Sequence, residues 1–154
     1  MRRWLLKSEP ESFSIEDLAK CPGQTTAWDG VRNFQARNFI RDTMKKGDLA
    51  FFYHSSCDVP GIVGIVEITR EAYPDATALD THSKYFDPKS TAEEPRWYVV
   101  DVRLKRKLRQ TLTLEKLKQF AASSLSELIL LKRGSRLSVM PISDDEWKFI
   151  TSLV

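Results

Sequence analysis

The chain has 154 residues and a mass of 17.7 kDa, the size of one ordinary domain, and its 42% apolar and 29% charged residues are typical of a folded protein. Its apolar runs fall far short of the roughly 18 residues of a membrane-spanning helix and of the roughly 7–15 residues in a signal peptide's apolar core. Two cysteines are too few for a disulfide scaffold. We therefore expect a single cytoplasmic domain, residues 1–154, without a membrane partner.

The net charge of +3 is small but unevenly distributed. Segments 32–46 and 101–109 are basic, whereas segment 67–94 is acidic. This asymmetry allows an anionic partner such as nucleic acid. Charge alone supports a solvated surface of mixed charge equally well.

The N-terminal part of the chain predicts a short buried strand and a capped helix. Leu5 and Leu6 form the apolar strand, with Trp4 before them. Ser14 then caps a helix that runs to about residue 20, and Phe13 with Leu18 forms a hydrophobic staple across its start.

A second helix is expected from about residue 33, where apolar side chains recur at helical spacing: Ala36, Phe39, Ile40 and Met44. A polar face carries Asn33, Arg37 and Arg41. Segments 49–53 and 61–68 are rich in aromatic and β-branched residues and predict strands.

The second half begins with a polar stretch, 73–95, whose length makes it a candidate functional loop. A long strand follows at 96–108. Helix caps are predicted at Thr113, at a Ser124–Glu127 capping box whose helix ends at Gly134, and at Ser143, after an extended segment at 137–142. Because strands and short helices alternate without a repeating βαβ unit, we expect an α+β domain around a curved sheet or partial barrel.

The residues do not favour catalysis. His54, Ser55 and Cys57 follow a predicted strand, but neighbours on an extended chain point apart and cannot form a nucleophile–base pair. Zinc would need about four Cys or His ligands, typically in C-x-x-C spacing. Gly61 and Gly64 lie within an apolar strand and indicate a bulge rather than a phosphate loop. No catalytic residue, metal ligand or cofactor is assigned.

Trp28 is the most informative of the four tryptophans. Trp4 and Trp147 lie on apolar patterns and are expected in the core, whereas Trp97 is ambiguous. Trp28 lies at a loop-to-helix junction among polar residues, where an indole could stack on a planar ligand. Packing in the core is the alternative, and the residues leave both open.

Eight runs of sequence together carry a family resemblance. In chain order they are Trp4–Pro10, Trp28–Asn38, Gly47–Ser55, Pro60–Gly64, Tyr73–Asp75, Tyr85–Ser90, Pro95–Val102 and Arg136–Pro141. This pattern covers nearly the whole chain and resembles the EVE domain family.

The resemblance implies a PUA-like fold, a small curved sheet or barrel decorated with short helices and related to the YTH domain. YTH domains bind a methylated adenine in an aromatic cage, and EVE domains are associated with modified bases in nucleic acid, cytosine modifications in particular. Carried over by position, the implied ligand-binding residues are Lys7, Ser8, Trp28, Asn33, Arg37, Asn38, His54, Ser55, Trp97, Arg136 and Ser138.

We therefore expect a non-catalytic protein that binds a modified base in DNA or RNA, with the base between Trp28 and a second wall at Trp97. Ser8 and Asn33 would contact the base edge, and three cations would hold phosphates: Lys7, Arg37 and Arg136. Nuclear animal members of the family carry a long basic N-terminal extension, whereas this chain begins almost at its first strand. This favours a stand-alone bacterial version that acts through a separate effector protein.

Two other hypotheses remain from the sequence. One is an enzyme that processes RNA or nucleotides with His54 as acid or base. The other is a protein-interaction module whose basic surface is incidental.

Overall fold

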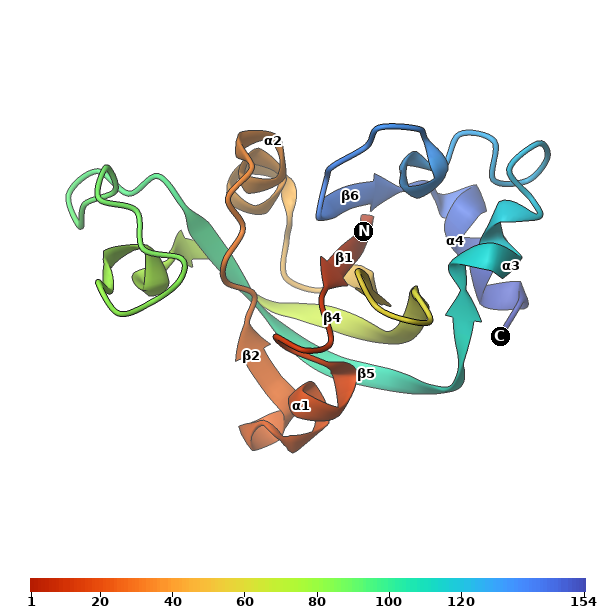
Figure 1. Cartoon of the computed structure of the whole chain (residues 1–154), viewed down its shortest axis with the longest axis horizontal. Coiled ribbons are helices and arrows are strands. Elements are labelled where there is room, and N and C mark those ends of the chain that lie inside the picture. The colour runs from red at the N-terminus through yellow and green to blue at the C-terminus, as the bar shows by residue number, and fades with distance from the viewer.

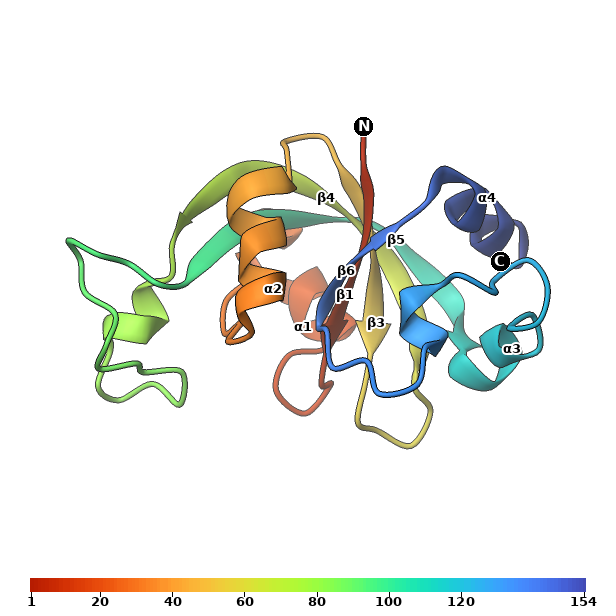
Figure 2. The same cartoon turned by 90° about the horizontal axis from the view of Figure 1, so that it is seen from above.

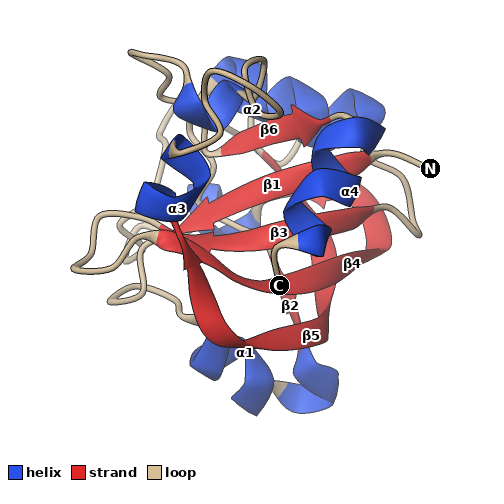
Figure 3. Ribbon diagram, turned by 90° about the vertical axis from the view of Figure 1, so that its right-hand side faces the viewer, coloured by secondary structure: helices blue, strands red, loops and turns tan.

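Six strands form one open, mixed sheet in the order β2-β5-β4-β3-β1-β6 (Figure 1). The computed structural model describes all residues, 1–154. The strands are β1 (Arg3–Ser8), β2 (Thr25–Ala27), β3 (Leu49–His54), β4 (Gly61–Pro74), β5 (Tyr98–Thr113) and β6 (Val139–Ile142). Only β1 and β3 run parallel; the other neighbours are antiparallel. The long strands β4 and β5 bend strongly, so the sheet curls without closing (Figure 3).

The helices are short and lie around the sheet. They are α1 (Ile15–Lys20), α2 (Phe34–Asn38), α3 (Leu114–Lys118) and α4 (Asp144–Ser152). A π-helical turn, Phe39–Thr43, continues α2, and 3-10 turns lie at Pro22–Gln24, Ala76–Leu79 and Ile129–Leu131. None of the helices has the length and apolar character that crossing a bilayer requires.

Alternation along the strands divides the core in two. In β1, Trp4 and Leu6 pack in one cluster with Phe52, whereas Leu5 and Phe51 pack in the other. Trp147 of α4 stacks on Phe51 with ring centroids 4.0 Å apart. Both the Trp4 and Trp147 core predictions are therefore confirmed.

The predicted helix caps are mostly confirmed. Ser14 and Ser143 each form a complete capping box, and Thr113 caps α3. The prediction of a helix after Ser124 is wrong. Successive i→i+3 hydrogen bonds instead fold residues 120–132 into turns, and Leu125 and Leu128, three residues apart, point into the core.

The polar stretch 73–95 begins with the end of β4 and continues as an excursion that returns at Trp97 to enter β5. It projects at the opposite end of the molecule from α3 and α4 (Figure 2). The bulge predicted at Gly61–Gly64 is present, since the register of β4 and β5 shifts between Ile62 and Gly64. β2 was not predicted, because three residues are too few to form a pattern.

Candidate functional site

A cavity of about 600 Å³ opens where β1 ends, a volume typical of small-ligand sites. Its walls come from the end of β1, strand β2, the segments before α1 and α2, the loop after β3, the 73–95 excursion and the segment before β6. Its lining includes Lys7, Ser8, Phe13, Trp28, Asp29, Gly30, Ser55, Ser56, Lys84, Tyr85, Arg136 and Ser138.

Trp28 belongs both to the core and to the cavity wall. Its ring meets Phe52 edge-on at a centroid distance of 5.2 Å, and the residue is only 6% exposed. Its backbone N–H donates to the Val100 carbonyl at 2.8 Å. The two interpretations left open by the sequence are therefore compatible, and core packing holds the indole rigidly at the cavity.

The end of β1 contributes Lys7 and Ser8 to the cavity lining, and the Lys7 Nζ lies 6.0 Å from the centroid of the Tyr53 ring. The backbone N–H of Lys7 donates to the Ser138 carbonyl at 2.8 Å, which ties β1 to the segment before β6. Burial lowers the pKa of the Lys7 ammonium, which is in none of the molecule's ion pairs. The Ser8 hydroxyl donates to the Phe13 carbonyl at 2.6 Å and keeps its acceptor lone pairs.

Cations slightly outnumber carboxylates around the cavity. Lys7, Lys84 and Arg136 are among its lining residues, and so are Glu9 and Asp29. Burial raises the pKa of the Asp29 carboxyl, and the nearby Asp75 carboxylate raises it further. The cavity therefore offers hydrogen-bond donors, an acidic acceptor and an aromatic surface within one small volume.

Tyr85 and Phe13, not Trp97, are the aromatic residues that line the cavity beside Trp28. Tyr85 approaches so closely to Gly30 that a Cβ at position 30 would lie 2.6 Å from the Tyr85 Cζ. Gly30 also has a φ of +79°, which glycine adopts readily. Sequence reasoning missed Tyr85, although Gly30 was a signal that another group approaches this turn.

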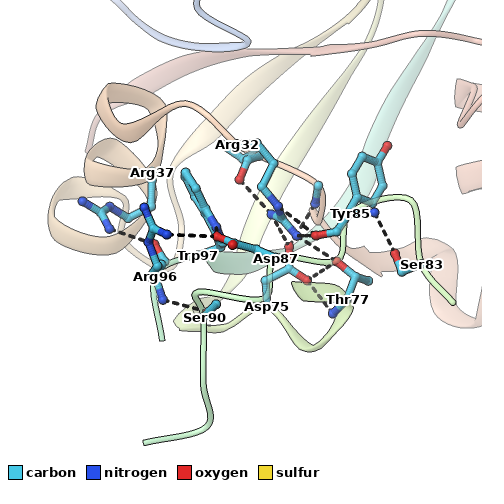
Figure 4. A network of polar contacts seen from close by, with 12 residues as sticks. Arg32, Arg37, Asp75, Thr77, Ser83, Tyr85, Asp87, Ser90, Arg96 and Trp97 are labelled. Atoms are coloured by element: carbon cyan, nitrogen blue, oxygen red, sulfur yellow. Dashed lines mark hydrogen bonds and ion pairs between the residues drawn. The ribbon is translucent and has the colours of Figure 1, made fainter. Parts of the chain in front are cut away.

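A partly buried ion pair holds Tyr85 in place (Figure 4). Arg32 pairs with Asp75 at 3.0 Å and donates two hydrogen bonds to the Tyr85 carbonyl, at 2.7 and 3.1 Å. Asp75 also accepts from the Gly30 N–H and from Thr77. Burial opposes ionisation of Asp75, but hydrogen bonds from Thr77, Gly30 and Arg32 outweigh it and lower the pKa of the carboxyl. Neither Arg32 nor Asp75 was among the predicted site residues.

Trp97 does not line the cavity, which corrects its expected place as the second wall. Phe34 stacks on it at a centroid distance of 4.8 Å, and its Nε1–H donates to Asp87 at 2.6 Å. Arg96 also pairs with Asp87, at 3.5 Å. These contacts hold Trp97 at the base of the excursion (Figure 4).

The polar face of α2 serves the fold rather than the cavity. The Asn33 side chain caps α2 by accepting from the Ala36 N–H at 2.9 Å. Arg37 donates to the Arg96 carbonyl at 2.7 Å and to the Asn38 side chain at 2.9 Å. The side chains of Asn33, Arg37 and Asn38 are therefore held by these hydrogen bonds and do not line the cavity.

His54 is engaged by the start of α1. Its Nε2 accepts a hydrogen bond from the Ile15 N–H at 3.1 Å, and its ring meets Phe52 edge-on. Burial lowers the pKa of the imidazole, an effect that Glu16 partly opposes. The ring is therefore neutral and occupied by a structural contact.

Of the predicted site residues, the structure brings six together around the cavity: Lys7, Ser8, Trp28, Ser55, Arg136 and Ser138. The other five lie outside its lining: Asn33, Arg37, Asn38, His54 and Trp97. Cys21 and Cys57 are free, and no group of three or more His, Cys, Asp or Glu side chains is placed to hold a metal ion.

Comparison with known proteins gives a consistent family assignment. A model of the EVE domain matches residues 2–153. Thymocyte nuclear protein 1 of Homo sapiens is 45% identical over 165 residues, which cover 97% of this chain and 72% of that protein.

Solved structures share the fold. A crystal structure of a Pseudomonas putida protein is 52% identical, with a TM-score of 0.92 and 98% of each chain covered. Human THYN1 protein in complex with 5-methylcytosine containing DNA is 44% identical, with a TM-score of 0.94, covering 99% of this chain and 97% of that one. A Zygosaccharomyces rouxii YTH domain is 18% identical, with a TM-score of 0.53 and coverage of 99% and 85%, a likeness of fold alone. The predicted PUA-like fold is confirmed.

Proposed function

The chain belongs to the EVE domain family, and we propose that its cavity binds one modified base of a nucleic acid strand without catalysing a reaction. The observation that carries the proposal is the 600 Å³ cavity lined by Trp28 and Tyr85. It is supported by the human relative at 44% identity, which was solved with 5-methylcytosine containing DNA.

A base must leave its stack to enter such a cavity. Unstacking and unpairing cost a few kcal/mol, and stacking on an aromatic side chain contributes about 1–3 kcal/mol per base. Trp28 suits this role because Phe52 and the Val100 carbonyl already fix it, so little further ordering is needed on binding. Tyr85 supplies a second aromatic surface, with its backbone held by Arg32.

Polar groups around the rings suit the edge of a base. The Asp29 carboxylate can accept from an exocyclic amine, as acidic side chains do with cytosine N4. Ser8 and Ser138 add hydroxyl groups, and Lys84 and Arg136 add cations suited to phosphates. Both DNA and RNA present exocyclic amines and phosphates to such side chains.

The proposal of a non-catalytic role is supported by His54. An imidazole acting as general base needs its lone pair free, but the His54 Nε2 already accepts from Ile15. Any cellular response to the bound base would then come from a separate effector protein.

Binding to matched duplexes tests the proposal. One short duplex carries a single 5-methylcytosine and the other carries cytosine, and affinities are measured by fluorescence anisotropy. Burial of the methyl group contributes about 0.8 kcal/mol, so we expect about fourfold tighter binding of the modified duplex. Trp28→Ala should weaken that binding by about 1–3 kcal/mol.

Phe34→Ala is the matched control, because Phe34 is a 47% exposed aromatic residue outside the cavity lining. It should leave the preference for the modified duplex intact. Equal affinity for both duplexes, together with wild-type binding by a folded Trp28→Ala variant, would refute the proposal. Mass spectrometry of nucleotides that co-purify with the protein would identify the modification bound.

A further inference from the structure

A second cavity, of about 670 Å³, lies at the bend of β5, between that strand, α3 and the end of the chain. Four cations line it: Arg106, Lys107, Arg109 and Lys116. No Asp or Glu side chain lines it. The site described above has no part in this surface.

The bend that forms this cavity is built into the strand pairing. Ile62 of β4 pairs with Leu112 of β5, yet Gly64 pairs with Lys107, so residues 108–111 of β5 oppose Val63 alone. Such an excess of residues on one strand bends it and increases its twist. β5 turns toward α3 at this point (Figure 1), which brings Arg106, Arg109 and Lys116 to one hollow.

Most of these cations lack an ion-pair partner within the protein. Lys107 pairs with Glu16 at 3.4 Å, but Arg106, Arg109 and Lys116 are in no ion pair. The preceding cations of the same strand differ, since Arg103 and Lys105 both pair with Glu67, at 2.7 and 3.7 Å. Unpaired guanidinium and ammonium groups in a hollow are suited to phosphate oxygens.

The two cavities lie at the same end of the sheet. Ser8, which lines the first cavity, pairs with His54; His54 pairs with Gly61, and Gly61 pairs with Thr113, which lines the second. These three steps between neighbouring strands span roughly 14 Å at the usual spacing of about 4.8 Å. The strand ends gather at one edge, beside α3, in Figure 3.

We infer that the β5 bend is a second contact surface, which binds the phosphodiester backbone of the same nucleic acid that offers its base to the first cavity. About 14 Å corresponds to about four nucleotides of a B-form strand at 3.4 Å each. The surface contributes affinity that does not depend on sequence or modification, whereas the first cavity discriminates between bases. This inference rests on the proposed function for the identity of the ligand.

The test compares two double variants with the same loss of charge. Arg106→Ala/Arg109→Ala removes unpaired cations of the bend, and Arg103→Ala/Lys105→Ala removes paired cations outside it. Affinities for the modified and unmodified duplexes are measured over a range of salt concentrations. In the bend variant, the magnitude of the slope of log affinity against log salt should decrease by about two. Binding of both duplexes should weaken by the same factor. The control variant should leave the slope close to wild type.

Lys116→Ala provides an independent variant on α3 and should lower the slope by about one. The free mononucleotide of 5-methylcytosine, which cannot reach the bend, should bind wild type and bend variant equally. Equal slope losses in the two double variants would overturn the inference, because the effect would then follow net charge alone. Unchanged duplex binding combined with lost binding of polyglutamate would also overturn it, in favour of an acidic protein partner.

The outcomes separate this inference from the proposed function. If wild type shows no preference for the modified duplex, the base-binding proposal fails, while the salt slopes on unmodified duplex still test the bend. If the preference holds and the slopes do not change, the bend inference alone fails.

Discussion

Gly30 and Tyr85 are in contact with no room for a side chain between them, since a Cβ on Gly30 would lie 2.6 Å from the Tyr85 Cζ. The turn before α2 and the 73–95 excursion therefore fix one another, although 55 residues separate them in sequence. The aromatic lining of the first cavity depends on this contact.

Gly30→Ala should therefore weaken base binding as well as stability. A residue with a Cβ at a φ of +79° costs about 1–2 kcal/mol, and the Tyr85 ring must also move. Gly134→Ala is the matched control, because Gly134 has the same φ of +79° but no atom within 4 Å of a Cβ there. Urea unfolding and duplex affinity should show the backbone cost in both variants and a loss of binding only in Gly30→Ala. Equal binding by the two would refute a role for the Gly30–Tyr85 contact.

Asp75→Asn should destabilise the excursion. It removes the charge that faces Arg32 in a site where the Asp75 side chain is 1% and the Arg32 side chain 23% exposed, and loss of hydrogen bonds to a charged group costs about 1.5–3 kcal/mol. The lowered pKa of Asp75 means that its contribution is complete above the ordinary value of 3.8 and is lost as the pH falls through the lower folded value. Unfolding free energies measured from neutral pH to pH 3 should fall more steeply in wild type than in Asp75→Asn. A double-mutant cycle with Arg32→Ala should show strong coupling, and additive effects would contradict a stabilising Arg32–Asp75 pair.

The stability of the protein should also decrease as His54 is protonated. Its folded pKa is lowered, so its contribution is present above the ordinary value of 6.5 and is lost as the pH falls below it. His54→Gln, whose side-chain oxygen can accept from the Ile15 N–H, should be less stable at pH 8 by at most about 1 kcal/mol and should lack the decline between pH 7 and pH 5. The exposed His82 supplies the control, because His82→Gln should retain the wild-type decline. Product formation from nucleic acid that disappears in His54→Gln would instead restore the enzyme hypothesis.

Arg136 and Arg37, both expected from the sequence to hold phosphates, should now behave differently. Arg136 lines the first cavity, so Arg136→Ala should lower affinity for modified and unmodified strands alike and reduce the salt slope by about one. Arg37 is bonded to the Arg96 carbonyl and stacks over Phe34 at 4.9 Å, so Arg37→Ala should chiefly lower thermal stability. A slope loss of about one in a stable Arg37→Ala variant would place a phosphate contact on α2 after all.

Features set by neighbouring residues could be predicted from the sequence. Ser14 and Ser143 cap their helices through residues three positions away, and β3 follows its apolar, aromatic-rich composition. Trp28 was ambiguous because its neighbours are polar, while the group that buries it, Phe52, comes from another strand.

The site as a whole depends on long-range contacts that no local pattern encodes. Arg32 meets Asp75 across 43 residues, and the same guanidinium donates to the Tyr85 carbonyl beside the cavity. Trp97 is the kind of residue that could form a cavity wall. However, its ring stacks on Phe34 and its Nε1–H donates to Asp87. The family resemblance predicted the region of the site. Which of the predicted residues line the cavity depends on side-chain packing.

The position of β1 between β3 and β6 has a consequence for how the chain is made. β1 is synthesised first, but its two partners are residues 49–54 and 139–142. A growing chain therefore carries an apolar strand with one unpaired edge until β6 has left the ribosome, and pairing over such separations is slow. The unpaired edge of Trp4–Leu6 is a template for association with other chains during that interval. Messages truncated before the codons for β6 should accordingly yield aggregates, and a chaperone that shields β1 should raise the yield of the full-length protein.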